Sequence, residues 1–279
     1  MSTATARSAR TENEAYAVGL ARAFAGAVIF SLPLLMTMEM WWFGFYLDRT
    51  RLLVFALANF AVLVGLSRVS GFEETHSRLE DVLDAFAAYA VAVLASAAVL
   101  FLLGVIEAGM PTGEIAGKIA IQAVPASFGA MIATKTLGEE AAGNEQERWR
   151  ATYPGQLFLM LAGALFLTFN VAPTEEMVLI AYRMTPWHGL ALVLLSIILL
   201  DVLVYSVGFS GQKQRGERGI VAALILYTFA GYAIAVGVSL FVLWTFGRTD
   251  GVDVANIAMM AAVLAFPGSI GAAIARLLV

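Results

Sequence analysis

The chain has 279 residues, of which 60% are hydrophobic and 14% charged, and its mean hydropathy is +0.82. Soluble globular domains carry about 25% charged residues, so this composition indicates a protein that crosses the lipid bilayer several times. The net charge of −4, without a basic cluster, gives no indication of nucleic-acid binding, and the lack of cysteine excludes disulfides and thiolate metal sites.

The first 21 residues lack the apolar core of a signal peptide and are predicted to form a cytoplasmic tail. Beyond them the apolar runs are long and uniform, without the alternation of barrel strands, so helices are expected. A span needs roughly 20 apolar residues. The sequence therefore predicts an all-α, polytopic membrane protein with eight spans, at about 22–46, 51–69, 83–107, 117–134, 156–181, 187–208, 219–246 and 252–276.

Lysine and arginine residues predict the orientation, because cytoplasmic loops carry an excess of both. Most of the 17 lie on the same side as the two termini. The other side collects five, namely Arg49, Arg51, Lys118, Arg183 and Arg248. We therefore expect a multi-pass protein of the bacterial inner (plasma) membrane with both termini in the cytoplasm.

Three stretches of the chain occur twice. Residues 25–40, AGAVIFSLPLLMTMEM, return as AGALFLTFNVAPTEEM at 162–177. FAAYAVAV in the third span returns as FAGYAIAV in the seventh, and AVPASFGAMIA in the fourth returns as AFPGSIGAAIA in the eighth. Matched Pro, Ser, Gly, Tyr and Glu in the same order indicate an internal duplication.

The duplication predicts two parallel four-helix repeats, because an even number of spans gives both halves the same orientation. The predicted parts are the tail at 1–21, the first repeat at 22–134, a polar cytoplasmic linker at 135–155 and the second repeat at 156–279.

The repeated glutamates are the first candidate site. Glu39 aligns with Glu176 and Thr37 with Thr174, while Glu175 is a further acid beside Glu176. A carboxylate in a membrane normally faces the protein interior or water and marks an ion or proton path. If the two approach each other, they could share a cation, which makes them candidate metal ligands. The alternative is that each reaches the outer headgroup region or caps a neighbouring helix.

The proline motifs of the fourth and eighth spans are the second candidate. Pro125 and Pro267 each remove a backbone donor, and Ser127 and Ser269 follow two residues later. Broken helices at matching places in two halves point to a transport site. The alternative is packing, since Gly129 with Ala133, and Gly271 with Ala275, form faces of small residues.

A third candidate is Asp201, which lies inside the sixth span without an acidic counterpart in the second. It either contributes to a site or bonds to Tyr205 or to a small polar group of another helix. Asn59 and Gln122 are weaker polar candidates, and Lys118 is expected to extend outward to the headgroups.

Enzyme motifs are not expected, and no cofactor is indicated. Ser127 has no histidine within a predicted span to activate it, and neither a metal-binding pair nor a phosphate loop occurs. Around MEMWWFG and AVPASFGAMIATKTLG the chain resembles an uncharacterised family of bacterial integral membrane proteins. That resemblance implies a membrane location and no particular activity.

From the residues we expect a transporter or permeation protein for a small cation or protons. Glu39 and Glu176 would be its charged ligands, and the proline motifs would line its path. Two alternatives stay open. One is an ion channel formed by a homo-oligomer, and the other is a membrane scaffold or sensor that transports nothing.

Overall fold

The protein is described by a computed structural model over residues 2–70, 78–136, 152–206 and 224–277. All regular elements in these ranges are helices, and eight of them are long and apolar enough to cross a membrane. The predicted all-α, polytopic fold with eight spans is therefore confirmed. Most of the predicted linker, residues 137–151, lies outside the described residues.

The chain divides into two compact units. The first comprises residues 1–46 and 53–143, and the second comprises 47–52 and 144–279. The two units meet in sequence at residues 143 and 144, and residues 47–52 belong to the second unit. The parallel arrangement of two repeats stays a prediction.

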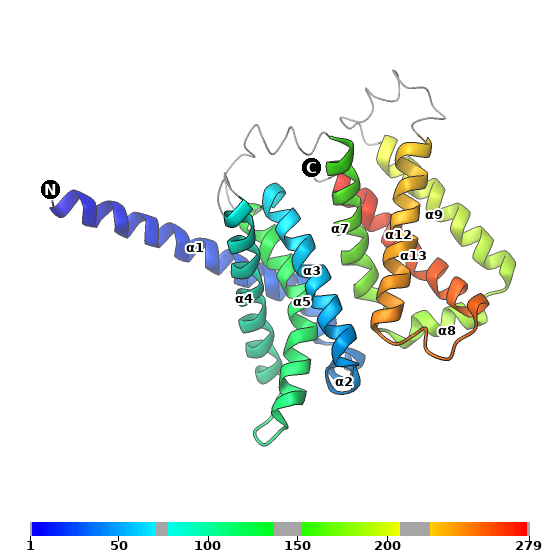
Figure 1. The fold of residues 1–279 in the computed structure, drawn as a ribbon, viewed down its shortest axis with the longest axis horizontal. Helices are drawn as coiled ribbons and strands as arrows, with labels where there is room; N and C mark the ends of the chain where they lie inside the picture. Colours follow the sequence, from blue (N-terminus) through cyan, green and yellow to red (C-terminus); the bar gives the residue numbers. More distant parts are fainter. Residues whose placement is uncertain (1, 71–77, 137–151, 207–223, 278–279) are drawn as a thin grey trace. The chain divides into compact units, whose positions relative to one another are not determined.

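The first unit is built around the helix that carries Pro125. Its members are α1 (Ser2–Leu35), α2 (Met38–Tyr46), α3 (Arg49–Ser70, from residue 53 on), α4 (Arg78–Leu102) and α5 (Thr112–Thr136) (Figure 1). In α5, 72% of the spanning residues are buried, against 33–39% in the other three spans. Helices α1, α2 and α4 all pack on α5, so the proline lies in the central helix.

The second unit is built around the helix that carries Pro267. Its members are α7 (Tyr153–Val171), α8 (Glu175–Arg183), α9 (Pro186–Ser206), the π-helix η1 (Leu224–Phe229), α12 (Ala230–Thr245) and α13 (Val254–Leu277). Helix α13 packs on α7, α8, α9 and α12 and is the most buried span of this unit. Both proline motifs therefore occupy central helices.

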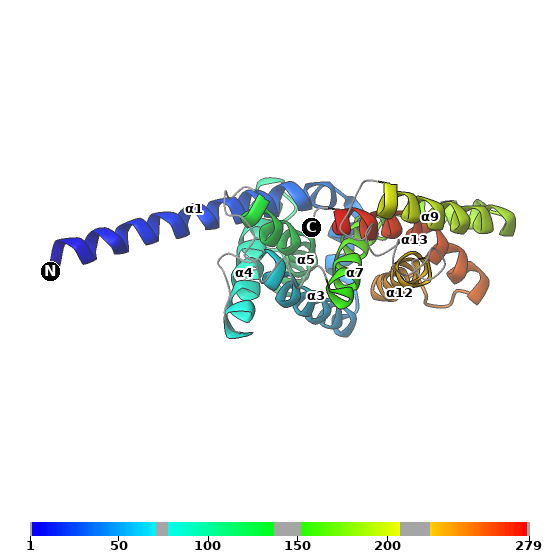
Figure 2. The same ribbon diagram turned by 90° about the horizontal axis from the view of Figure 1, so that it is seen from above.

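Several boundaries differ from the prediction, most of all in the first and fifth spans and in the predicted tail. The predicted spans 22–46 and 156–181 each consist of a long helix, a break and a short helix, namely α1 with α2 and α7 with α8. The predicted tail is helical from Ser2, and α1 extends beyond the other helices of its unit (Figures 1 and 2). Alanine, arginine and glutamate are frequent in this segment and favour helix over coil.

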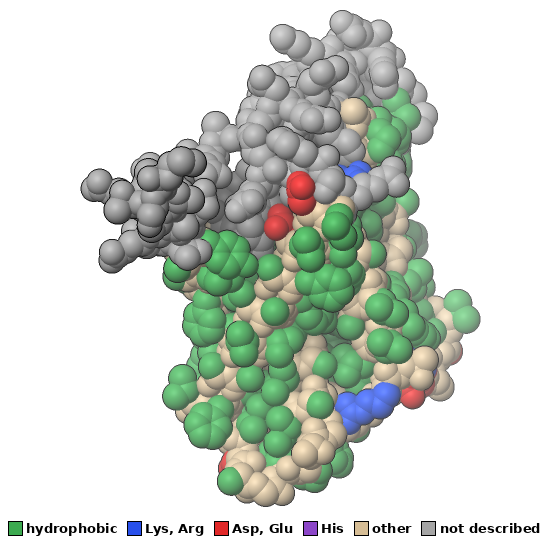
Figure 3. Space-filling view, turned by 60° about the vertical axis from the view of Figure 1, so that its left-hand side comes forward, with side chains coloured by type: hydrophobic (Ala, Val, Ile, Leu, Met, Phe, Trp, Pro, Cys, Tyr) green, Lys and Arg blue, Asp and Glu red, His purple; other side chains and the backbone are tan. Residues whose placement is uncertain are grey.

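The outward surface of the helices is apolar. Figure 3 shows apolar side chains over most of the described surface in that view, with charged side chains near its ends. In α9, only 22% of the spanning residues are buried, and Leu190, Leu194 and Ile198 are exposed. Surfaces of this kind suit lipid rather than water.

Glycines bring the central helix of each unit against its first long helix. A Cβ on Gly26 of α1 would lie 2.4 Å from the carbonyl oxygen of Gly129 in α5. A Cβ on Gly163 of α7 would lie 2.1 Å from the carbonyl oxygen of Gly271 in α13. The small-residue faces therefore make the close helix contact that the packing interpretation predicts.

Candidate functional site

Glu39 and Glu176 lie in short helices that follow the long apolar helices α1 and α7. Each occupies the second position of a short helix, Glu39 in α2 and Glu176 in α8, with Glu175 before it. Glu39 is half-buried, whereas Glu175 and Glu176 are exposed. The long helices that precede them end at Leu35 and Val171, so the glutamates follow a break in the helix, and their place in the membrane stays a prediction.

The repeated Thr-x-Glu-Met pattern starts a helix in both units. Thr37 donates its hydroxyl to the Pro33 carbonyl at 2.6 Å, and Thr174 donates to the Val171 carbonyl at 2.9 Å. Each threonine thus closes the end of the long helix that precedes it. The glutamate follows in the first turn, where a negative charge complements the helix dipole.

Prolines explain why the chain leaves the helix at these two places. Pro33 lies in the last turn of α1, and Pro173 lies in the turn between α7 and α8. Proline cannot donate a backbone hydrogen bond, and it disfavours a helical conformation in the residue before it. Met40 and Met177, which close the pattern, are 2% and 1% exposed and anchor the short helices.

Ser127 belongs to a buried polar group in the first unit. It donates to the Val124 carbonyl at 2.7 Å and accepts from the Asn59 amide of α3 at 2.9 Å. One turn earlier, Gln122 donates to the Leu34 carbonyl of α1 at 3.0 Å. All three polar side chains are fully buried, and the oxygens Asn59 Oδ1 and Gln122 Oε1 have no hydrogen-bond partner.

The second proline motif has a different setting. Ser269 donates to the Phe266 carbonyl at 2.8 Å, as Ser127 does to the residue before its proline. On the facing helix α7, Thr168 is fully buried, and its hydroxyl has no hydrogen-bond partner. Helices α5 and α13 continue through Pro125 and Pro267, so the expectation of broken helices there was wrong. The surrounding helices hold them in place.

Asp201 is bonded to another helix. Its Oδ1 accepts a 2.9 Å hydrogen bond from the fully buried hydroxyl of Thr228, which lies in the π-helix η1. The sequence left two bonding partners open for Asp201, Tyr205 or a small polar group of another helix. Thr228 is a small polar group of another helix, so the second of these is present. Single π turns occur frequently at functional sites.

The first unit has a corresponding pair with the two groups exchanged. Ser67 of α3 donates its hydroxyl to Asp84 of α4 at 3.1 Å. The hydroxyl therefore lies on the earlier helix of the pair, whereas in the second unit the earlier helix, α9, carries the acid. Beside it, Arg68 pairs with the buried Asp81 at 2.8 Å. Each unit therefore joins two neighbouring helices through an acid and a hydroxyl.

Lys118 lies at the other end of the first unit. It is 8% exposed, donates to the Val105 carbonyl at 3.2 Å and pairs with Glu114 at 2.8 Å. The expectation that it extends outward was wrong, because a carboxylate one turn before it and a loop carbonyl satisfy the ammonium within the protein.

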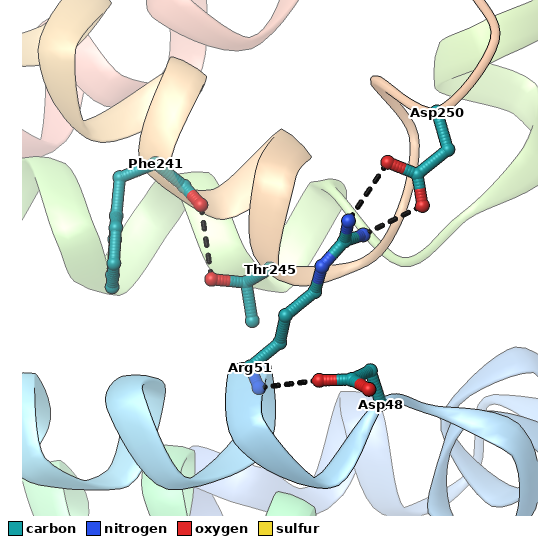
Figure 4. Close-up of polar contacts among 5 residues, drawn as sticks. All are labelled: Asp48, Arg51, Phe241, Thr245 and Asp250. Atoms are coloured by element: carbon teal, nitrogen blue, oxygen red, sulfur yellow. Dashed lines mark hydrogen bonds and ion pairs between the residues drawn. The ribbon is translucent and has the colours of Figure 1, made fainter.

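Arg51 forms the corresponding charged cluster in the second unit, to which residues 47–52 belong (Figure 4). Its guanidinium makes two 2.8 Å bonds to Asp250 and lies 5.3 Å from the centre of the Trp244 ring. The hydrogen bond from Arg51 lowers the pKa of Asp250 below its ordinary value of 3.8. Bonds from Asn256 lower the pKa of Asp253 in the same way.

A metal centre built from acids and histidines is not present among the described residues, since no three such side chains gather there. A metal site at Glu39 and Glu176 stays a prediction from the sequence. The buried oxygens that the structure adds are neutral amides and hydroxyls.

Sequence reasoning missed Thr168, Thr228, Ser67 and Asp84. Ser31 and Thr168 align with each other in the repeated stretch, but only the structure shows that their hydrogen bonding differs. Ser31 donates to the carbonyl of its own helix at Ala27, whereas Thr168 does not bond to its own helix.

The comparisons with known proteins give one match. No curated protein and no solved structure matches the chain. A family model described as "Putative integral membrane protein (DUF2391)" matches residues 19–279, which is nearly the whole chain and includes both units. With its eight apolar helices and its lipid-facing surface, the chain belongs to this family of integral membrane proteins.

Proposed function

We propose that the protein lets a small cation or protons cross the bacterial inner membrane, with both termini in the cytoplasm. The observation that carries this proposal is a column of buried polar side chains along the first unit. Its members are Lys118, Gln122, Ser127 bonded to Asn59, Ser67, and Asp81 paired with Arg68, and each of the six residues Lys118, Gln122, Ser127, Asn59, Ser67 and Asp81 is at most 8% exposed.

The spacing of this column supports stepwise passage. Gln122 and Ser127 are five residues apart on α5, which is about 7.5 Å along the helix. Asn59 and Ser67 are eight residues apart on α3, which is about 12 Å. Water molecules or a partly hydrated ion can bridge gaps of this size. Buried polar groups in membrane helices are costly and mark ion or proton pathways by default.

The repeated glutamates have a different role in this proposal from the one first expected. At the start of α2, Glu39 follows the end of the long helix α1, where it attracts a cation to the first unit, and Glu176 has the same place at the start of α8 in the second unit. Asn59, Gln122 and Ser127 then supply neutral oxygens within the unit. Asp84 supplies an acid near the start of α4 in the same unit, and Asp201 supplies one near the end of α9 in the second unit.

Ion flux in proteoliposomes tests the proposal, with calcium, sodium, potassium and proton gradients in both directions. Asn59→Leu removes the central amide and should abolish most of the flux of the wild-type ion. Ser239→Ala is the matched control, because its buried hydroxyl bonds only to the Ala235 carbonyl of its own helix. Glu39→Gln/Glu176→Gln should lower flux at low ion concentration more than at saturation.

Flux that Asn59→Leu leaves unchanged would exclude the column as the path. A folded wild-type protein without flux for any of the four ions would support the scaffold or sensor alternative. Single-channel currents would instead support the channel alternative, including its oligomeric form.

A further inference from the structure

The short helix α2 is apolar on its buried side and on its exposed side. Met40, Phe43 and Gly44 are buried against the rest of the first unit. The opposite side, which we call the aromatic face, is between 56% and 64% exposed and consists of Met38, Trp42, Phe45 and Tyr46. These four share one side because they are spaced i, i+4, i+7 and i+8 on a helix of 3.6 residues per turn. Large apolar side chains gathered in this way mark a surface that is covered by something other than water.

Two contacts hold α2 so that the aromatic face points away from the first unit. A Cβ on Gly44 would lie 2.5 Å from the Lys118 Cα atom, so the backbones of α2 and α5 touch at this point. At the break between the helices, Trp41 Nε1 donates a 2.7 Å hydrogen bond to the Leu35 carbonyl at the end of α1. Rotation of α2 about its axis would lose both contacts. The aromatic face therefore stays turned outward.

The corresponding helix of the second unit carries charged residues on the same side. When the repeated stretch is aligned without a gap, Met38 corresponds to Glu175 and Tyr46 corresponds to Arg183. Both charged residues of α8 are exposed. A short helix at this place in a unit can thus have a polar outer side. The aromatic face is a property of the first unit, and it indicates that α2 has surroundings different from those of α8.

The chain on either side of α2 indicates what covers the aromatic face. Before α2, Ile29, Leu32 and Met36 are exposed and belong to the apolar outward surface described above. After α2, residues 48–50 are exposed, and two of the three are charged. Helix α2 therefore connects a segment suited to acyl chains with a segment suited to water. Tryptophan and tyrosine are enriched at that boundary, because their rings are apolar and their N–H or O–H groups reach water.

We propose that the aromatic face of α2 is seated in the bilayer, at the boundary between headgroups and acyl chains, whereas the same side of α8 is exposed to water. With a length of about 13.5 Å, α2 is too short to cross the bilayer and suits a position at its surface. Burial of its exposed apolar side chains stabilises that position, as in other interfacial helices. The aromatic face contains no basic side chain, so no particular headgroup charge is required. This lipid contact does not depend on the passage of ions.

Nitroxide labels on single cysteines test the proposal, because the chain has no cysteine of its own. Trp42→Cys and Leu179→Cys are matched variants, since the two positions align and both are exposed. Power-saturation EPR in vesicles of phosphatidylethanolamine and phosphatidylglycerol compares two collision partners of the label. Molecular oxygen concentrates in lipid, and a nickel chelate stays in water. The label of Trp42→Cys should collide more with oxygen, and that of Leu179→Cys should collide more with the nickel chelate.

Two further labels calibrate the measurement. Leu194→Cys, on the exposed side of α9, represents lipid, and Glu107→Cys, in the segment before α5, represents water. Tyr46→Cys and Arg183→Cys form a second matched pair, which decides the question if replacement of the tryptophan disturbs folding. Its two labels should differ in the same direction as those of the first pair.

Three results would contradict the proposal. More collisions with the nickel chelate than with oxygen at position 42 would overturn the lipid contact of α2. Few collisions with either reagent there would also overturn it, and would indicate that a second copy of the chain covers the aromatic face. Collisions at position 179 that match those at position 42 would overturn the difference between α2 and α8.

Discussion

Single glycines determine how closely the two principal helices of each unit approach. Gly26→Ala would place a methyl group 2.1 Å from the Ala133 Cβ, and Gly163→Ala would place one 2.5 Å from the Ala275 Cβ. Real Cβ contacts are never this short, so the helices must separate. Each substitution should cost about 1–3 kcal/mol or more, because overpacking displaces backbone as well as side chains.

Reversible unfolding in bicelles would measure these costs. The matched controls are Gly19→Ala in α1 and Gly237→Ala in α12, where a Cβ meets nothing within 4 Å. They should be neutral or stabilising by up to about 1 kcal/mol, since alanine favours helix over glycine. Equal effects at Gly26 and Gly19 would contradict the close contact.

The ion pair between Arg51 and Asp250 makes the stability of the folded protein depend on pH in the acid range. Arg51 lowers the pKa of Asp250 below the ordinary value of 3.8, so the pair stabilises the folded state fully above that pH. The contribution is lost as the pH falls through the lower folded-state pKa. Wild type should therefore have a higher Tm than Asp250→Asn at pH 7, and the difference should disappear in strong acid.

A scan of Tm against pH for both proteins checks this. Asp253→Asn is a useful comparison, because Asp253 also has a lowered pKa but bonds to Asn256 within the start of its own helix. A Tm difference for Asp250→Asn that grows as the pH falls would contradict the assigned direction.

Among the elements, the π-helix η1 depends most visibly on one side-chain bond. A π turn is rare and needs support, which the bond from Thr228 to Asp201 provides. Thr228→Val removes that bond and leaves the half-buried carboxylate without it, at a cost of about 1.5–3 kcal/mol for a bond to a charged group.

Amide hydrogen exchange would detect this change in η1 and the start of α12. Exchange should be faster in Thr228→Val and close to wild type in Thr228→Ser, which keeps the hydroxyl. Unaltered exchange in the valine variant would show that packing alone holds the π turn.

The elements also show what the sequence can and cannot predict. Apolar runs of sufficient length predicted all eight spans, because lipid imposes one simple requirement on every segment. The separation of α2 and α8 was missed, since Trp41, Phe43 and Phe45 continue the apolar run beyond the break. The repeated Thr and Glu carried the correct signal for a helix start but also fit an intramembrane acid.

Some candidate site residues could be predicted from the sequence, and others could be identified only in the structure. Ser127 and Ser269 were predicted from their prolines, and both are fully buried in central helices. The partners Asn59 and Thr168 could not be ranked, because burial and hydrogen bonding depend on which helix packs beside them. Pairwise contacts between distant segments are tertiary information that one sequence does not display.

At the scale of the whole molecule, the even number of spans predicts that both termini lie on one side of the membrane. The chain has no cysteine, so single cysteines report topology without background. Glu107→Cys and Thr249→Cys, in the segments before α5 and α13, should react with a membrane-impermeant maleimide added outside cells. Ser8→Cys should react only after the membrane is opened, and labelling of Ser8→Cys in intact cells would contradict the orientation.

The exchanged acid and hydroxyl pairs have a consequence for assembly during synthesis. Similar helices from two halves of one chain are at risk of pairing with the wrong partner. If α4 met α9, Asp84 and Asp201 would bring two carboxylates together. If α3 met η1, Ser67 and Thr228 would bring two hydroxyls together and leave both acids elsewhere. Because each half assigns the acid to the opposite helix, neither of these two exchanges joins an acid to a hydroxyl, whereas the pairing within each half does.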